Sequence, residues 1–213
     1  MKCHVTLLSV LVLCATLCSA AEPIKVACVG DSITFGYGLQ EVEKYPAQLA
    51  KLLGEKYQIG NFGVNGATLL KKGDKPYWKE PSFQAATDFK PNIVVIKLGT
   101  NDTKGGNYAF KSDFVADLTA LVDTFAALPS KPKIFLCKPV PAFAPTFGIM
   151  EKGIEDMVNP GVDAVAKAKS LPVIDLHTAL SGKKEMFPDS IHPNGAGAAL
   201  IAKAVADAIM AAK

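Results

Sequence analysis

Short apolar runs and amphipathic segments alternate along most of this chain. Runs of apolar residues that end at Gly or polar residues are typical of buried parallel strands, whereas apolar positions spaced three and four apart indicate helices. The apolar runs predict five strands, at residues 26–29, 57–64, 92–98, 133–140 and 172–176. The helical patterns fall at 45–53, 82–89, 110–128, 150–170 and 194–212.

This order of elements predicts an α/β fold. Strands that alternate with helices form a doubly wound, flavodoxin-like parallel sheet of five strands, with helices on both faces. Neither an internal repeat nor a low-complexity linker interrupts residues 22–213, so we expect them to form a single domain. One helical pattern contains the triplet 159–161, Asn-Pro-Gly, where the proline must kink the helix or begin a new one.

The first 21 residues have a different pattern, which is typical of a signal peptide. Lys2 precedes an apolar core at 5–17, and small residues follow, with cleavage equally compatible after Ala20 or Ala21. The core is shorter than the roughly 20 residues that span a bilayer, and no later segment approaches that length. We therefore expect a secreted or periplasmic protein without a membrane span in its mature form.

The five cysteines divide between the predicted signal peptide and the mature chain. Cys14 and Cys18 lie in the signal segment, where a lipid anchor is the alternative interpretation, although a large Leu before each disfavours that processing. In the mature chain, Cys28 and Cys137 each lie within an apolar run, where buried free thiols are common. We expect free thiols at both positions, and a disulfide between them is the alternative.

Charge and motif content exclude several classes of function. The chain has 23 basic residues, all of them Lys, against 20 acidic residues. A nearly balanced charge without Arg disfavours nucleic-acid binding. Because the sequence contains neither CxxC nor HExxH, we expect no metal site and no cofactor.

Polar, glycine-containing segments lie where the predicted strands end. They are Gly30-Asp31-Ser32 after the first strand, 63–66 after the second and 99–102 after the third, together with 189–193 before the last helix. The carboxyl ends of parallel strands share one edge of a sheet, where ligands usually bind. Ser32 at this edge is either a nucleophile or the N-cap of a following helix.

A serine nucleophile needs a base, a carboxylate that orients the base, and donors for the oxyanion. Two histidines of the mature chain qualify as the base. His177 follows the fifth strand, two residues after Asp175, and His192 lies three residues after Asp189. Both spacings allow the carboxylate to reach the imidazole, so this pattern alone leaves the choice open.

Four segments, G-D-S-I-T, G-V-N-G-A-T, G-T-N-D and D-S-I-H-P, occur in this order and together resemble the four blocks of the SGNH (GDSL) hydrolase family. The resemblance covers nearly the whole mature chain. It implies that Ser32 is the nucleophile, His192 the general base and Asp189 its orienting carboxylate. It also implies an oxyanion hole formed by the backbone N–H groups of Ser32 and Gly66 and the side-chain amide of Asn101.

Two further acidic residues lie inside these blocks, Asp31 and Asp102. We expect both to be structural rather than catalytic, with Asp31 bonding to the turn or completing a local hydrogen-bond network.

The expected reaction is ester hydrolysis through an acyl-serine intermediate, without metal or cofactor. Aromatic side chains near the predicted edge suit stacking on sugar rings, namely Tyr37, Tyr77, Trp78, Phe143 and Phe147. Since the family includes sialate and polysaccharide O-acetylesterases, we expect a small-molecule or glycan ester substrate with a short acyl group. The lack of Arg disfavours an acidic sugar.

Two alternatives remain at this point. The family also includes lysophospholipases and thioesterases, which hydrolyse lipid esters. A catalytically silent carbohydrate-binding protein would keep the fold but lose catalytic residues, and all of these are present in the sequence. The oligomeric state is open.

Overall fold

The structure, a computed structural model, describes residues 22–212. The predicted signal peptide at 1–21 lies outside these residues. Across the described part of the chain, no helix combines the length and the apolar character needed to cross a membrane.

A five-stranded sheet in the order β2-β1-β3-β4-β5 forms the centre of the molecule, and all neighbouring strands are parallel. The strands are β1 (Ile24–Gly30), β2 (Tyr57–Gly63), β3 (Ile93–Lys97), β4 (Lys133–Lys138) and β5 (Val173–Asp175). The predicted α/β fold is therefore confirmed. In register, Gly30 is opposite both Gly63 and Lys97, so the polar segments after the first three strands begin at one edge.

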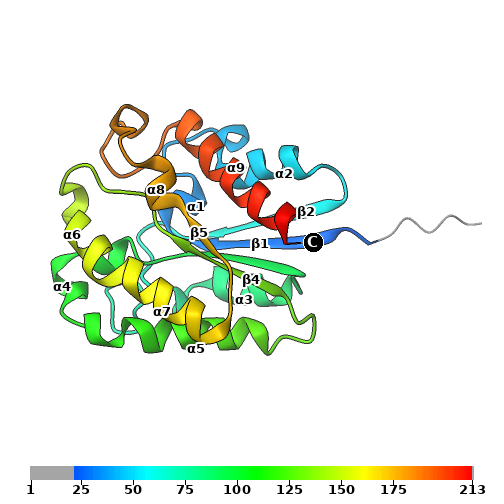
Figure 1. Cartoon of the computed structure of the whole chain (residues 1–213), viewed down its shortest axis with the longest axis horizontal. Coiled ribbons are helices and arrows are strands. Elements are labelled where there is room, and N and C mark those ends of the chain that lie inside the picture. Colours follow the sequence, from blue (N-terminus) through cyan, green and yellow to red (C-terminus); the bar gives the residue numbers. More distant parts are fainter. Residues whose placement is uncertain (1–21, 213) are drawn as a thin grey trace, which may run out of the picture.

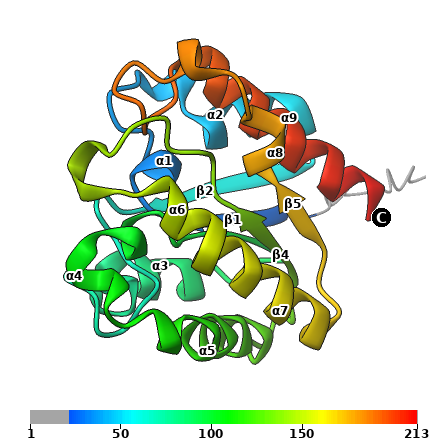
Figure 2. The same ribbon diagram turned by 60° about the vertical axis from the view of Figure 1, so that its left-hand side comes forward.

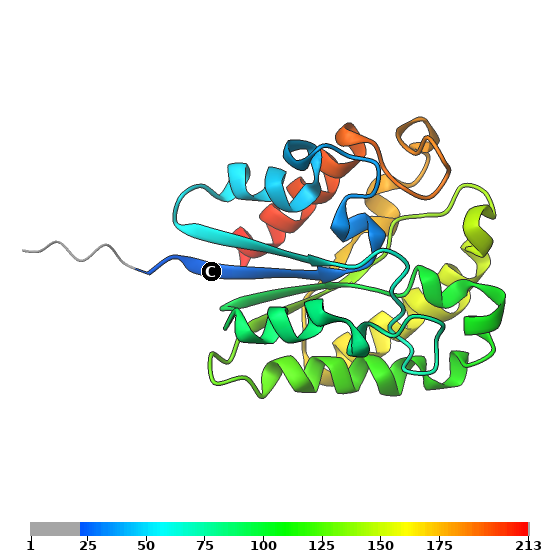
Figure 3. The same ribbon diagram turned by 180° about the vertical axis from the view of Figure 1, so that it is seen from behind.

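Helices cover both faces of the sheet (Figure 1). On one face lie α1 (Ser32–Phe35), α2 (Tyr45–Leu53), α8 (Leu176–Leu180) and α9 (Gly195–Ala211). On the other lie α3 (Pro81–Asp88), α4 (Gly105–Tyr108), α5 (Phe114–Ala126), α6 (Glu151–Gly153) and α7 (Asn159–Lys169). Figure 2 shows α5 and α7 side by side, and Figure 3 shows α3 beside α5 from behind.

Alternation along β1 builds two hydrophobic cores, one on each face of the sheet. Val26 and Cys28 point into the core beneath α2 and α9, whereas Ala27 and Val29 point into the core beneath α5 and α7. All four side chains are completely buried. A strand with both faces buried reads as a continuous apolar run, which is why the sequence pattern located it.

Two helical predictions differ in detail from the structure. The pattern at 110–128 predicts one helix, but a short 3-10 turn at Lys111–Asp113 precedes α5, which begins at Phe114. The pattern at 150–170 divides into α6, a π-helical turn at Ile154–Val158 and α7. Pro160 follows the π-helical turn directly, and the flanking residues Val158 and Asn159 keep helical φ/ψ, so the helical backbone continues through the proline without a break.

The two cysteines of the described chain are free and buried, as expected. Cys28 lies on β1 and Cys137 on β4. Burial in the apolar core raises the pKa of each thiol to about 12, so neither is reactive at neutral pH.

Candidate active site

Ser32 lies at the sharp turn that connects β1 to α1. The N-cap of α1 is Asp31, whose carboxylate accepts a hydrogen bond from Ile33 N at 3.0 Å. The turn is tightly packed, because a Cβ on Gly30 would lie 2.0 Å from Oγ1 of Thr34. Since Asp31 takes the capping role, the hydroxyl of Ser32 remains available for other contacts.

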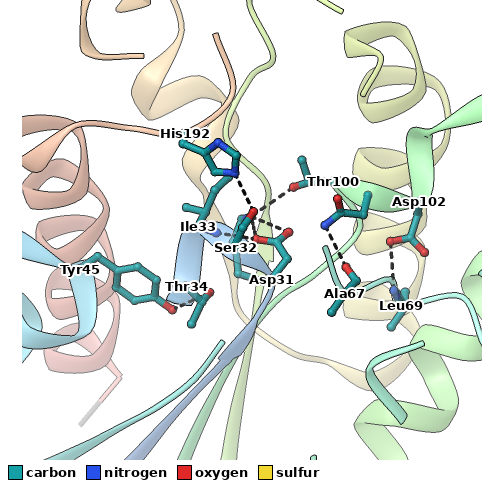
Figure 4. Close-up of polar contacts among 12 residues, drawn as sticks. Asp31, Ser32, Ile33, Thr34, Tyr45, Ala67, Leu69, Thr100, Asp102 and His192 are labelled. Atoms are coloured by element: carbon teal, nitrogen blue, oxygen red, sulfur yellow. Dashed lines mark hydrogen bonds and ion pairs between the residues drawn. The ribbon is translucent and has the colours of Figure 1, made fainter. Parts of the chain in front are cut away.

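The hydroxyl of Ser32 bonds to His192 across 160 residues of sequence (Figure 4). Ser32 Oγ lies 2.8 Å from His192 Nε2, and His192 Nδ1 lies 2.7 Å from Asp189 Oδ2. A carboxylate only accepts hydrogen bonds, so the proton of the neutral ring belongs on Nδ1. Nε2 is then free to accept the proton of the Ser32 hydroxyl.

Asp189 is held in place by its own loop. Its Oδ1 accepts hydrogen bonds from the backbone N–H groups of Ile191 and His192, at 3.0 and 2.7 Å. Partial burial pushes the pKa of Asp189 upward, but the N–H groups and the ring of His192 outweigh burial and keep that pKa below its ordinary value. Asp189 is therefore an ionised carboxylate directed at the imidazole.

His177, the other histidine of the described chain, forms a separate pair. It lies on α8, and its Nε2 is 2.6 Å from Oε1 of Glu151. Asp175, the carboxylate suggested by sequence spacing, instead caps α8 through Thr178 N at 2.8 Å. Asp175 therefore caps the helix that carries His177, and the hydrogen-bond partner of His177 is Glu151 of α6.

Gly66 and Asn101 line the same pocket as Ser32. Gly66 has a φ of 77°, a left-handed conformation that favours glycine. The Asn101 side-chain amide donates one hydrogen to Ala67 O at 3.0 Å, which leaves its second hydrogen for a ligand. The N–H of Ser32, at the start of α1, has no carbonyl partner within that helix.

These groups surround a small open pocket of about 190 Å³. Ser32, Gly66, Asn101 and His192 all line it, so the residues singled out in four separate sequence blocks meet around one cavity. A hydroxyl paired with an imidazole, a carboxylate behind the ring and N–H donors opposite can together support nucleophilic attack on a carbonyl group.

Comparison with known proteins agrees with this geometry. Residues 28–200 match the model of the GDSL-like lipase/acylhydrolase family. The chain belongs to this family. An acetylxylan esterase from Xylanibacter ruminicola is 42% identical over 208 residues, covering 88% of this chain. The match covers 43% of that esterase, so the chain spans less than half the length of this curated relative.

Solved structures share the fold of this GDSL-family chain at lower identity. A carbohydrate acetylesterase from Sinorhizobium meliloti has a TM-score of 0.73 at 21% identity, covering 89% of this chain and 99% of that one. The native aryl esterase of M. smegmatis has a TM-score of 0.67 at 20% identity, covering 88% and 98%. At this identity the likeness concerns the fold alone.

Two of the five aromatic residues proposed from sequence lie at the pocket that Ser32 and His192 line. The Tyr37 and Phe147 rings approach the ring of His192, with centroid distances of 4.5 and 5.7 Å, and both line the pocket. Their exposed fractions are 47% and 55%, so each has a face available for a ligand. Phe147 is held in a left-handed backbone conformation, with a φ of 56°.

The other three aromatic residues are used in packing. Tyr77 is fully buried and donates its hydroxyl hydrogen to Phe62 O at 2.7 Å. Trp78 donates to Leu69 O at 2.8 Å, and the ring of Phe143 lies 4.9 Å from that of Phe187. Sequence cannot distinguish an aromatic ring on an open loop from one folded onto the core. We therefore withdraw these three as candidate substrate contacts.

Asp102 connects two of the sequence blocks. Its carboxylate accepts hydrogen bonds from Leu69 N at 3.0 Å and Leu70 N at 2.7 Å, and the residue is fully buried. Burial raises the pKa of this carboxyl to about 7, although the two N–H groups act in the opposite direction. Asp102 thereby attaches the loop of Asn101 to the loop of Gly66.

Sequence reasoning missed several residues around the site. Asn65, Lys104 and Ile149 also line the pocket. Lys97 ends a strand and is buried against Asp31, with Nζ 2.7 Å from its carboxylate. A charged residue at the end of the apolar run 93–97 is a signal that could have identified it. Among residues 22–212, no group of three His, Cys, Asp or Glu residues is placed to hold a metal ion.

Proposed function

We propose that this protein is a carboxylic ester hydrolase that removes acetyl groups from carbohydrates through an acyl-Ser32 intermediate. The observation that carries the proposal is the continuous hydrogen-bonded chain from Ser32 Oγ through His192 to Asp189, which opens into a small pocket. Membership of the GDSL-like lipase/acylhydrolase family supports the same class of reaction.

In the first half of the reaction, Ser32 Oγ attacks the carbonyl carbon of the ester while His192 Nε2 accepts the hydroxyl proton. The negative charge that develops on the carbonyl oxygen is stabilised by the N–H groups of Ser32 and Gly66 and by the free amide hydrogen of Asn101. His192 then gives its proton to the alcohol oxygen. The C–O bond to the alcohol breaks, and the acyl group remains on Ser32.

In the second half of the reaction, water takes the place of Ser32 as the nucleophile. His192 Nε2 takes a proton from a water molecule, whose oxygen attacks the acyl-Ser32 carbonyl, and the same donors stabilise the second oxyanion. The proton returns to Ser32 Oγ as the carboxylic acid departs. Throughout both steps Asp189 holds Nδ1–H and stabilises the positive charge on the ring.

A carbohydrate leaving group is supported by the surroundings of His192. Because His192 must reach the leaving alcohol oxygen, this part of the substrate lies near the exposed rings of Tyr37 and Phe147. A second hollow of about 190 Å³ adjoins the first and shares Tyr37 and His192 with it. The name of the acetylxylan esterase relative supports this substrate class.

The small pocket supports a short acyl group, and a series of p-nitrophenyl esters from acetate to octanoate tests this. An enzyme that buries a lipid chain gains about 0.8 kcal/mol per CH₂, roughly fourfold in kcat/KM for each added carbon. We expect kcat/KM to fall along the series, since the extra carbons do not fit. A steady rise would favour a lysophospholipase-like enzyme and would leave the Ser32 mechanism intact.

Labelling with a fluorophosphonate probe separates an enzyme from a silent binding protein. We expect the folded protein to be labelled and the Ser32→Ala variant to remain unlabelled. A folded wild-type protein that binds acetylated xylan oligosaccharides but takes no label would contradict the esterase proposal.

We also propose that residues 1–21 direct export and are removed, so that the enzyme is secreted or periplasmic. Its relative's name, acetylxylan esterase, is consistent with an extracellular polymer as substrate. The N-terminal sequence of the exported protein tests this, with Ala21 or Glu22 expected as the first residue.

A further inference from the structure

Directly behind the candidate active site lies a buried ion pair that the mechanism above does not use. The ammonium of Lys97 lies 2.7 and 2.9 Å from the two carboxylate oxygens of Asp31 and 3.1 Å from Oγ1 of Thr100. Asp31 is 0% exposed, Lys97 1% and Thr100 3%. All three of these bonds are therefore shielded from solvent.

The two partners of Lys97 each precede a residue of the candidate machinery in the chain. Asp31 comes immediately before Ser32, and Thr100 immediately before Asn101. Figure 4 shows Asp31 just below Ser32 and Thr100 to its right. Lys97, as the last residue of β3, thus bonds both to the turn that carries the nucleophile and to the turn that carries the side-chain oxyanion donor.

Stability alone is a weak explanation for this arrangement. Removing two charges from water costs about as much as their attraction returns, and apolar residues of similar volume often stabilise a core equally well. An ion pair of this kind fixes the relative positions of the groups it joins, because the ammonium holds its acceptors at defined distances. An oxyanion hole depends on such distances, since its donors must be aimed at one oxygen atom.

We propose that Lys97 is a positioning residue, which sets the distance between Ser32 and the Asn101 amide by bonding to Asp31 and Thr100 together. This inference rests on the proposed esterase function. It does not make Lys97 a catalytic residue, because its ammonium contacts neither the pocket nor the reacting atoms. Its effect is expected in kcat rather than in KM.

Thr100→Val is the mildest test, because it keeps the side-chain shape and the Asp31–Lys97 pair but removes one acceptor. We expect kcat for p-nitrophenyl acetate to fall on the order of tenfold to a hundredfold with KM nearly unchanged, and the melting temperature to fall modestly because one N–H of the buried ammonium loses its acceptor. Thr100→Ser, which restores the hydroxyl, should recover most of the lost kcat. An unchanged kcat in Thr100→Val would overturn the proposal.

The double variant Asp31→Asn with Lys97→Met removes both charges together, which avoids leaving an unpaired buried charge. Asn at position 31 can still cap α1, so the turn of Ser32 is retained. The control is Lys138→Met, because Lys138, like Lys97, is the last residue of a strand and forms ion pairs, in its case with Asp163 and Asp175, but it does not line the pocket. We expect a large loss of kcat only in the double variant, and equal losses in both would overturn the proposal.

Coupling to Asn101 distinguishes positioning from general loosening of the structure. If Thr100 acts through Asn101, Thr100→Val should change kcat by less than about twofold in an Asn101→Ala background. The same fractional loss in both backgrounds would refute the inference while the esterase function stands. A folded wild-type protein without activity on any ester would instead contradict the proposed function itself.

Discussion

The molecule contains two histidine–carboxylate pairs that look alike in isolation. His192 lies 2.7 Å from Asp189, and His177 lies 2.6 Å from Glu151. Their side chains are similarly buried, with exposed fractions of 11% and 30% in the first pair and 19% and 32% in the second. Distance to a carboxylate and burial therefore do not distinguish a candidate general base from a structural pair.

What differs is the ring nitrogen that each carboxylate uses. Asp189 holds Nδ1 of His192 and leaves Nε2 facing Ser32, whereas Glu151 holds Nε2 of His177. The second carboxylate oxygen of Glu151 accepts from Ala142 N, so that pair connects α8 and α6 to the loop after β4. The comparison teaches that the group opposite the carboxylate decides what an imidazole can do.

The most direct test of this difference is to remove each imidazole ring in turn. His192→Ala should lose on the order of a thousandfold or more in kcat, because no other group can accept the Ser32 proton. His177→Ala should stay within about tenfold, since its ring only connects two helices and a loop. Both expected losses are measured as kcat for p-nitrophenyl acetate. An inactive but folded His177→Ala variant would reverse the assignment of the base.

A second difference between the pairs is that the proposed oxyanion donors Gly66 and Asn101 line the same pocket as His192, whereas His177 does not line it. Asn101→Ala should lower kcat roughly 100- to 1,000-fold, about 2.7 to 4 kcal/mol, with little change in KM. The proposed reason is that its free amide hydrogen bonds the oxyanion and not the resting ester. A variant whose KM rises while kcat holds would show that Asn101 binds substrate instead.

The smallest expected effect concerns the pH dependence of stability. Burial raises the pKa of Asp189, but hydrogen bonds to His192 and Ile191 hold it below the ordinary value of 3.8. A carboxyl whose pKa is lower in the folded state stabilises the fold above its unfolded pKa, and this stability is lost as the pH falls through the folded value. Asp189→Asn should therefore cost below about 1 kcal/mol near pH 7.

Urea unfolding at about pH 7 and about pH 3 measures this difference for the wild type and Asp189→Asn. We expect the difference between the two proteins to be smaller at the acidic pH, because stability contributed by the carboxylate begins to be lost once the pH falls below the unfolded pKa of about 3.8. A difference in stability of the same size at both pH values would show that the carboxylate charge does not contribute.

Local signals were sufficient for most of the fold. Helix α2 begins at Tyr45 and ends at Leu53 as predicted, because Pro46 favours the first turn and Gly54 ends the last. The start of α5 was predicted four residues too early, at Phe110 instead of Phe114. Phe110 continues the apolar pattern in sequence, but it remains 36% exposed and lies outside the helix.

The aromatic loops show where local signals stop being informative. Tyr37 and Tyr77 both lie in polar, glycine-containing segments, yet Tyr37 is half exposed and Tyr77 is fully buried. Only the path of each loop over the core determines which ring remains open to a ligand. Lys97 was missed for a related reason, because its partner Asp31 is 66 residues away in the chain.

The sequence by itself determined the five strands and the longer helices between them, the position of Ser32 at a strand end and, through four spaced blocks, the family, whereas the short helices α1, α4 and α8 were not predicted. These properties depend on hydrophobic periodicity and on turn residues, which act over a few neighbouring positions. The tertiary structure alone decided which carboxylate holds His177, which aromatic rings face the pocket and which cation lies behind the nucleophile. Those contacts join residues far apart in the chain, so they exist only once the sheet has brought its strand ends together.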